Sequence, residues 1–475
     1  MPVPRTIPCP WWPIVAVLAL TACDFSQSRA NAAYADYQAA IANNDLIAAR
    51  QALTRLVTIQ DNVATNWVEL GKLQASMGSF DGAYYSFTRA NELNRGDPNI
   101  LRALTEIALR GGNFTAAKTH GKDLEVVAPG DPWAKLAAGY ANLKESRFED
   151  AAKVADTILS ASPYDANGVT LKARALLGES REDEALKLLQ SQVKAQPSDF
   201  SSLTLLAKIY GRHADWRNVA QTARQIVKLN PNDFDTSLLL IEAALRSGDV
   251  PGGREASFRV LKADADPTRI SAVLDLWSSY WPTPQALADA AQLAAKANSI
   301  PSRLAYASYL NRGGRPAEAM RIAAGAAALP ITAENAQANA VVADSLSLSG
   351  QSGDAKARYD AVLAFDSGNA TALRGRSELL LRTGKPKAAT EDAQKLISVL
   401  PQSGRDRLLL ARCYTASGDN PAAQRVLWDG FQTILADDAI YSAIRSTKQG
   451  NAEAVLAVDE EFDRQRDAKL NQRIF

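Results

Sequence analysis

The sequence is poor in the residues that most often carry out chemistry. Its 475 residues include two histidines, three cysteines and three methionines. His120 and His213 have no partners at metal-ligand spacing, and no paired-cysteine, zinc-protease, nucleophile-turn or phosphate-loop motif occurs. The sequence therefore predicts no metal site, no cofactor and no catalytic residues, and we interpret the protein as a non-enzyme.

An excess of charge of one sign is also missing. Lysine and arginine number 53 against 52 aspartates and glutamates, which gives a net charge of +1. A strong overall basic field is absent, so we predict no nucleic-acid partner. The acidic cluster at residues 459–463 lacks the alternating spacing of a calcium loop, and we interpret it as a solvated helix face. Runs of β-branched residues are scarce, whereas alanine and leucine dominate the apolar residues, which favours helices.

The first 23 residues have the features of a targeting signal. After Arg5, an apolar run covers residues 11–22, which is about two-thirds of the length needed to cross a hydrocarbon core. The run ends in Leu-Thr-Ala directly before Cys23, and a polar stretch follows. This pattern resembles the bacterial lipoprotein signal, in which small residues admit the peptidase and the cysteine thiol accepts acyl chains.

The lipoprotein resemblance implies a signal peptide over residues 1–22, a lipidated Cys23 that carries palmitate, and a linker over residues 23–30. Several acyl chains would anchor the mature protein firmly to the bacterial cell envelope, facing the periplasm. Asp24 resembles the signal that retains some lipoproteins in the inner membrane, but both membranes stay open. A plain secretory signal or an N-terminal anchor with a fortuitous cysteine is the alternative. Only Cys413 would then keep a free thiol, so no intrachain disulfide is expected.

The rest of the chain repeats with a period of 34 residues. Phe80, Phe114 and Phe148 are each 34 residues apart. Prolines and alanines keep the same period: Pro129, Pro163, Pro197, Pro231, Ala83, Ala117, Ala151 and Ala185. Glycine usually stands at the fifteenth position of each unit, where a left-handed backbone can end a helix. Small residues at the eighth and twentieth positions let two antiparallel helices approach closely, so each unit is predicted to be a helix-turn-helix hairpin that stacks on its neighbours.

The unit that begins at Ala64 shows the repeat family most clearly. It contains the pattern Trp67, Leu70, Gly71, Ala83, Phe87 and Ala90. This pattern resembles the tetratricopeptide repeat, and the resemblance covers roughly residues 31–437. It implies an all-α fold, a solenoid of stacked helix-turn-helix repeats that form a right-handed superhelix.

Changes in the period suggest how the solenoid is divided. The predicted parts are an N-terminal repeat block at residues 31–267, an irregular junction at 268–299, a C-terminal repeat block at 300–437 and a capping helix at 438–475. The junction contains Trp277, Tyr280 and Trp281. We interpret these aromatic residues as packing between irregular repeats, and an exposed anchor for a partner is the alternative.

The resemblance also implies a concave groove lined by the first helix of each repeat. The groove positions carry thirteen basic and five acidic residues, although the chain as a whole is nearly neutral. The acidic residues are Glu106, Asp235, Glu242, Asp344 and Glu378. The basic residues are Lys72, Arg102, Arg110, Lys144, Arg174, Lys208, Arg212, Arg246, Arg312, Arg374, Arg382, Arg405 and Arg412. We select the first eight of them, up to Arg246, as candidate partner-binding residues.

Two interpretations of this basic groove stay open. It could bind an anionic ligand, such as an acidic peptide, the acidic surface of a partner or an acidic polysaccharide. Alternatively, six of the thirteen residues stand in the last turn of a helix, where the helix dipole favours a positive charge in any case. The leading functional hypothesis is a lipid-anchored scaffold for protein partners in an envelope assembly, such as exopolysaccharide export, pilus or secretion machinery. A chaperone-like or glycan-binding accessory factor is the alternative.

Overall fold

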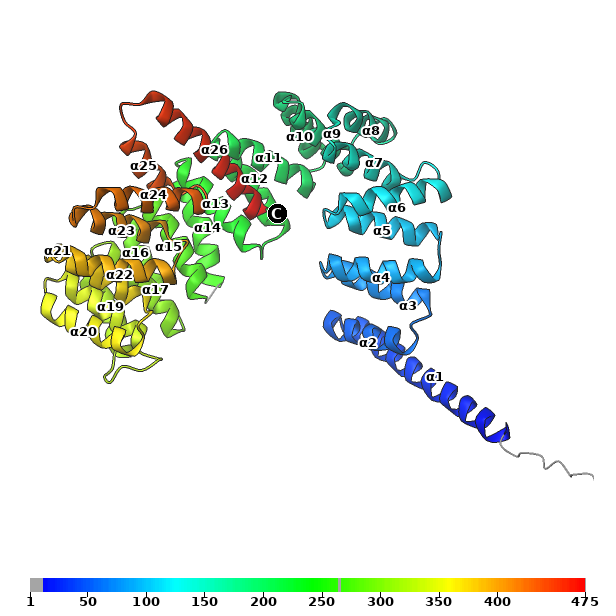
Figure 1. Cartoon of the computed structure of the whole chain (residues 1–475), viewed down its shortest axis with the longest axis horizontal. Helices are drawn as coiled ribbons and strands as arrows, with labels where there is room; N and C mark the ends of the chain where they lie inside the picture. Colours follow the sequence, from blue (N-terminus) through cyan, green and yellow to red (C-terminus); the bar gives the residue numbers. More distant parts are fainter. Residues whose placement is uncertain (1–11, 264–265, 475) are drawn as a thin grey trace, which may run out of the picture. The chain divides into compact units, whose positions relative to one another are not determined.

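The computed structural model describes residues 12–263 and 266–474, and these residues form α-helices joined by short turns (Figure 1). They contain 26 α-helices, one short 3-10 helix and no strand. The predicted all-α solenoid of stacked helix-turn-helix repeats is thereby confirmed. The chain forms two compact units, Met1–Gln196 and Pro197–Phe475.

The first unit consists of ten helices that follow one another in pairs. They are α1 Trp12–Ala42, α2 Leu46–Ile59, α3 Ala64–Ser76, α4 Phe80–Leu93, α5 Pro98–Arg110, α6 Phe114–Val127, α7 Pro132–Lys144, α8 Phe148–Ala161, α9 Ala166–Gly178 and α10 Glu182–Ala195.

The second unit continues the pairs and closes with two further helices. They are α11 Phe200–Arg212, α12 Trp216–Leu229, α13 Phe234–Arg246, α14 Val250–Ala263, α15 Pro267–Tyr280, α16 Pro284–Lys296, α17 Ile300–Arg312, α18 Pro316–Ala323 with the 3-10 helix Ala324–Ala326, α19 Ala336–Leu348, α20 Ser352–Phe365, α21 Ala370–Arg382, α22 Pro386–Val399, α23 Gly404–Ala416, α24 Asn420–Thr433, α25 Asp438–Thr447 and α26 Ala452–Ile474.

Aspartate caps mark the start of the first helix in five consecutive pairs. The side chains of five aspartates accept hydrogen bonds from backbone N–H groups two or three residues further on, which satisfies donors that the first turn of a helix leaves unpaired. These aspartates are 34 residues apart: Asp97, Asp131, Asp165, Asp199 and Asp233. The cap therefore repeats with the same period as the sequence pattern.

The turn inside most pairs has a left-handed residue at the predicted position, whereas the α15–α16 turn has none. Glycine fills it in several repeats, for example Gly112 with φ of 71°. In three consecutive repeats a residue with a side chain adopts the same conformation: Ser146 and Ser180 at 58° and Ala214 at 54°. The repeat geometry thus overrides the steric cost of a Cβ at this position.

Small residues allow the paired helices to pack closely, as predicted. Ala83, Ala117, Ala151 and Ala185 are completely buried. At Gly71 a Cβ would stand 3.0 Å from the Phe87 ring, which leaves almost no space for a larger residue. Close packing of this kind lets each hairpin bury its apolar face against the next.

The N-terminal helix includes part of the predicted targeting region. The predicted linker, residues 23–30, is helical within α1, and residues 1–11 of the predicted signal peptide lie outside the described residues. The side chain of Cys23 is also outside what the structure describes. Among the described residues, no helix has both the length and the apolar character needed to span a bilayer. Cleavage and lipidation at Cys23 therefore stay predictions.

The aromatic residues of the expected junction lie inside the second unit. Trp277 is fully buried, its indole N–H donates to the Ser257 hydroxyl at 2.9 Å, and its ring packs edge-on against Trp281. One continuous apolar core runs from α11 through α15 and α16 to α19. This core crosses residues 268–299, and the two compact units adjoin in the sequence at Gln196–Pro197. The irregular junction expected over residues 268–299 stays a prediction. The packing interpretation of Trp277 is supported by its burial.

The C-terminal segment folds as two helices, whereas the sequence suggested one capping helix over 438–475. α25 packs against α23 and α24, and Val458 and Phe462 of α26 join the same apolar cluster. α26 then reaches α11 and α13 of the same unit (Figure 1). The segment therefore covers the end of the solenoid and also contacts the beginning of the second unit.

Candidate binding surface on the second unit

The eight selected basic residues are divided between the two units. Five of them lie in the first unit: Lys72, Arg102, Arg110, Lys144 and Arg174. The first three pair with nearby carboxylates. Lys72 contacts Glu69 at 2.8 Å, Arg102 contacts the buried cap Asp131 at 2.7 Å, and Arg110 contacts Glu106 at 2.7 Å.

The remaining two basic residues of the first unit have different surroundings. Lys144 donates to the Thr115 hydroxyl at 3.1 Å. Arg174 has a buried Nε atom that finds no hydrogen-bond partner among the described residues. Two of the five, Lys72 and Arg110, pair within their own helix, which agrees with the interpretation that a positive charge is placed there for structural reasons.

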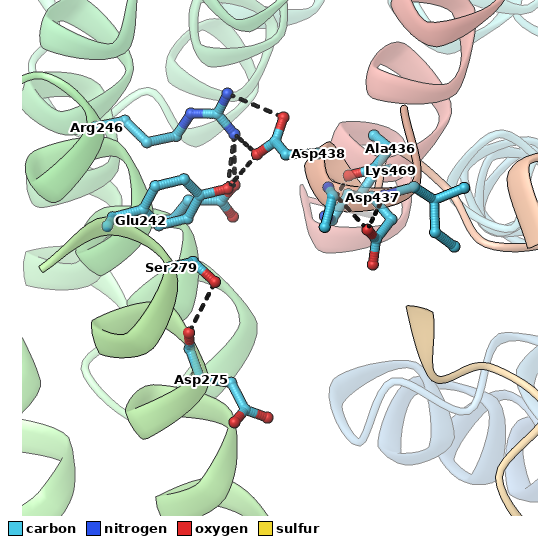
Figure 2. Close-up of polar contacts among 11 residues, drawn as sticks. Glu242, Arg246, Asp275, Ser279, Ala436, Asp437, Asp438 and Lys469 are labelled. Carbon is cyan, nitrogen blue, oxygen red and sulfur yellow. Dashed lines mark hydrogen bonds and ion pairs between the residues drawn. The ribbon is translucent and has the colours of Figure 1, made fainter. Parts of the chain in front are cut away.

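In the second unit, the C-terminal segment covers Arg246. Figure 2 shows Arg246 pointing from α13 toward Asp438 at the start of α25, and the two side chains are 2.9 Å apart. Arg246 also contacts Glu242 at 3.2 Å, and its guanidinium lies 4.1 Å from the Trp216 ring centroid. Burial disfavours the charge, but Tyr280, Asp438 and Glu242 outweigh it and raise the pKa of Arg246.

Two further selected residues stand on α11 beside the C-terminal segment. Arg212 contacts Asp467 of α26 at 3.0 Å, and Arg466 donates to the Arg212 carbonyl oxygen at 2.7 Å. Lys208 lies one helical turn before Arg212 and is half-buried. Arg212 and Arg246 are therefore already in contact with carboxylates of the same chain.

A pocket of the second unit lies further along the solenoid. It has a volume of about 560 Å³ and is lined mainly by α17, α19, α21 and α23. We call it the arginine pocket, and its charged lining residues are Arg312, Arg374, Arg382, Arg405, Asp344 and Glu378. All six occupy predicted groove positions, but none is among the eight basic residues selected from the sequence.

The four arginines differ in how firmly they are paired. Arg374 is fixed by the fully buried Asp406, with contacts of 2.6 and 2.7 Å. Arg312 contacts the exposed Asp275 at 2.5 Å.

The other two arginines have weaker compensation. Arg405 is 3.5 Å from Glu378, and Arg382 donates to the Ser347 hydroxyl at 2.5 Å. Burial together with the neighbouring Arg374 and Arg312 lowers the pKa of Arg405, which is what positive charges crowded together produce. Arg382 and Arg405 are therefore the residues best placed to receive an anionic group.

A buried carboxyl group forms the floor of this pocket. The Tyr359 hydroxyl donates to Asp344 Oδ1 at 2.6 Å. Burial raises the pKa of Asp344 to about 7 and outweighs the opposite effect of the Tyr359 hydrogen bond. A Cβ at Gly375 would stand 2.2 Å from Asp344 Oδ1 and 2.3 Å from the Tyr359 hydroxyl, so only glycine fits beside this pair.

Apolar side chains complete the pocket wall. Leu287, Tyr309 and Leu348 line it, and Leu348 is 45% exposed. An arginine cluster beside aliphatic side chains can bind a chemical group that is both anionic and partly apolar. No group of histidine, cysteine, aspartate or glutamate suited to a metal ion occurs among the described residues. Cys413 is buried next to Ser377, which agrees with the packing role expected of a lone cysteine.

Comparisons with known proteins give structural likenesses only. No family model matches the chain, and no curated protein matches it. Among solved structures, a tetratricopeptide repeat protein from Parabacteroides merdae is 13% identical, with a TM-score of 0.38, over 56% of this chain and 98% of the other. A thermophilic TPR protein of Thermus thermophilus is 20% identical, with a TM-score of 0.35, over 38% of this chain and 100% of the other. The APC/C hetero-tetramer Cut9–Hcn1 gives 13% identity and a TM-score of 0.30, over 94% of this chain and 96% of the other.

The described part of this chain is an all-α solenoid of helical repeats. That statement rests on its own helices, caps and turns, because likenesses at these identities and TM-scores assign neither family nor function.

Proposed function

We propose that this protein is a non-catalytic scaffold that binds an anionic segment of a protein partner in the arginine pocket. The observation that carries the proposal is the incomplete pairing of Arg382 and Arg405. Arg382 contacts a neutral hydroxyl, and Arg405 stands 3.5 Å from its nearest carboxylate partner. A carboxylate of the partner can accept charge-assisted hydrogen bonds from both guanidinium groups.

The apolar wall of the pocket favours a polypeptide over a polysaccharide. Leu287 and Leu348 offer an aliphatic surface beside the arginines, which suits a side chain of a peptide. Tyr309 is only 3% exposed, so its ring does not provide the flat aromatic platform on which a sugar could stack. The alternative is an accessory factor that binds an acidic glycan, or a chaperone-like factor that binds an extended polypeptide. The experiment below distinguishes these ligands from a specific protein partner.

The proposed cellular setting depends on the N-terminal signal. A lipidated Cys23 would attach the solenoid to a bacterial membrane on its periplasmic side, with the inner or outer membrane open. The partner would then belong to an envelope assembly such as exopolysaccharide export, pilus or secretion machinery. Labelling the growing cells with a radioactive fatty acid tests the anchor, because label must enter the natural chain and be lost in Cys23→Ala.

The first prediction concerns partner capture by pocket variants. We expect Arg382→Gln with Arg405→Gln to lose most of the bound partner when the tagged full chain is purified from detergent-solubilised envelopes. The physical reason is that two charge-assisted contacts disappear, and each contributes about 1.5–3 kcal/mol. Quantitative mass spectrometry of the co-purified proteins measures the loss.

Arg425→Gln is the matched control for this experiment. Arg425 is an exposed arginine on α24, outside the pocket. One or two stoichiometric proteins that are lost in the pocket variant and kept in the control support the proposal. Equal capture by the pocket variant contradicts it, and a pocket-dependent acidic glycan would favour the accessory-factor alternative.

A further inference from the structure

A second surface of the same unit carries arginines that lie outside the arginine pocket. It consists of the exposed sides of α11 and α13 that carry Arg212 and Arg246, together with Trp216 at the start of α12. We call it the latch face, because α25 and α26 lie across it. Arg212 contacts Asp467 of that segment at 3.0 Å. Arg246 contacts Asp438 of the same segment at 2.9 Å (Figure 2).

The contact between the segment and the latch face combines ion pairs with a few apolar side chains, but it is not a shared hydrophobic core. The apolar residues of α26, Val458 and Phe462, belong to a cluster formed by α23, α24 and α25. The apolar cluster that contains α11 and α13 includes no residue of α25 or α26. The latch face is therefore not part of a shared hydrophobic core, which is the interaction that makes a docked helix permanent.

The polar contact is also imperfectly satisfied. Arg466 Nε and Asp467 Oδ1 are buried without a hydrogen-bond partner among the described residues. A small cavity of about 20 Å³ remains between the two surfaces, lined by Trp216, Leu239 and Phe462 among others. Buried polar atoms without partners cost free energy. Arg246 and Asp438 also share hydrogen bonds with the Tyr280 hydroxyl, at 2.9 and 2.5 Å. Because the segment and the latch face belong to different apolar clusters, opening of this contact leaves both clusters intact.

Other contacts hold the segment at its opposite side. Gln465 donates to the Phe431 carbonyl oxygen at 2.5 Å and accepts from the Ala436 N–H at 3.2 Å. Lys469 donates to the Ala436 carbonyl oxygen at 3.1 Å. These contacts connect α26 to the end of α24, so α26 can leave the latch face while it stays attached to its own end of the solenoid.

We propose that the latch face is a second interaction surface, which takes an acidic helical segment of a partner protein when α25 and α26 move away. The present occupant shows the chemistry that fits: carboxylates at the places of Asp438 and Asp467, each opposite an arginine. Trp216 adds an aromatic surface beside Arg246. The C-terminal segment then acts as an intramolecular competitor, and the proposal does not depend on the arginine pocket.

A distance measurement in the full chain tests whether the latch opens. Spin labels are placed at Arg217→Cys on α12 and Arg464→Cys on α26, both exposed positions, in a full chain that also carries Cys9→Ser and Cys23→Ser, while Cys413 is buried. We expect a short and a long distance population, with the long one increased about fivefold or more by Arg212→Gln together with Arg246→Gln, and also by high salt. Arg425→Gln should leave the distribution unchanged.

A synthetic peptide of residues 452–474, which contains Asp467, then tests the surface itself. Its binding should be tighter to the full chain carrying Asp438→Asn and Asp467→Asn than to the natural chain, and Arg212→Gln should abolish it. A single short distance in every variant overturns the proposal, as does a peptide that fails to bind the opened chain. Peptide binding that is lost in Arg382→Gln with Arg405→Gln also overturns it, because the peptide would then occupy the arginine pocket, and the proposed function would stand.

Discussion

At the scale of single residues, Asp344 links the arginine pocket to pH. Its carboxyl group faces Tyr359 on α20, Arg374 and Glu378 on α21, and Arg405 on α23. Burial is the main reason for its raised pKa of about 7. An aspartate in an unfolded chain has a pKa of about 3.9, so the folded state holds this proton more tightly than the unfolded state does. Stability must then fall as the pH rises from about 4 to about 7, where the unfolded chain has lost the proton and the folded chain keeps it.

The second prediction follows from this sign. Asp344→Asn is expected to keep the hydrogen bond from Tyr359, since its amide oxygen can still accept, while the ionisable group is removed. The melting temperature of the natural chain should decrease from pH 5 to pH 8 by several degrees more than that of the variant. Thermal unfolding followed by circular dichroism at several pH values measures this. Parallel curves for the two proteins would show that Asp344 is ionised throughout.

The pocket also shows what residue-level sequence analysis could and could not predict. The tetratricopeptide resemblance assigned Arg312, Arg374, Arg382 and Arg405 to expected groove positions, and in the structure all four line the arginine pocket. The period gave no reason to prefer them over the eight residues up to Arg246, because it does not show which charges are neutralised by neighbours. The raised pKa of Asp344 could not be predicted from the sequence either, since it depends on burial by several helices.

At the scale of helices, the repeat turns offer the clearest test of the fold. Ala214 lies in the turn between α11 and α12. Its φ is 54°, and other repeats have glycine at this position. Its Cβ is sterically costly in a left-handed backbone, whereas glycine adopts this backbone without that cost.

The third prediction is that Ala214→Gly stabilises the protein. We expect a gain of about 0.5–1 kcal/mol in the free energy of unfolding, because relief of the steric cost exceeds the added entropy of the unfolded chain. Urea denaturation of both proteins measures the change. Gly248→Ala, which introduces the same strain at φ of 82°, should destabilise the chain and serves as the opposite control. Destabilisation by Ala214→Gly would contradict the left-handed turn.

The helices themselves were largely predictable, and their long-range contacts were not. Many of their starts and ends follow from local chemistry, as the aspartate cap Asp165 and the left-handed Gly112 illustrate. The contact of Arg212 with Asp467 joins residues that are 255 positions apart, and no periodic signal reports such a pairing. The sequence suggested one capping helix over 438–475. The structure has a break between α25 and α26, and α26 contacts α11 and α13.

At the scale of the whole molecule, the predicted anchor and the proposed binding surfaces belong to different units. Cys23 belongs to the first unit, whereas the arginine pocket and the latch face both belong to the second. The irregular junction predicted over residues 268–299, where the period changes, stays a prediction. The two compact units adjoin in the sequence at Gln196–Pro197, and the core around Trp277 continues without a break through the irregular repeat. A scaffold of this kind can hold a partner on one unit while the other is attached elsewhere.

Site-specific photo-crosslinking in growing cells tests the central claim, binding of a partner in the arginine pocket, most directly. A photoreactive phenylalanine analogue replaces Leu348, which lines the pocket and is 45% exposed, or Leu229, which is 44% exposed and lies outside the pocket. The account predicts a discrete protein adduct at position 348, none of the same mass at position 229, and loss of the adduct when Arg382→Gln and Arg405→Gln are added. Identical adducts at both positions, or an adduct at 348 that persists without the two arginines, would contradict the account.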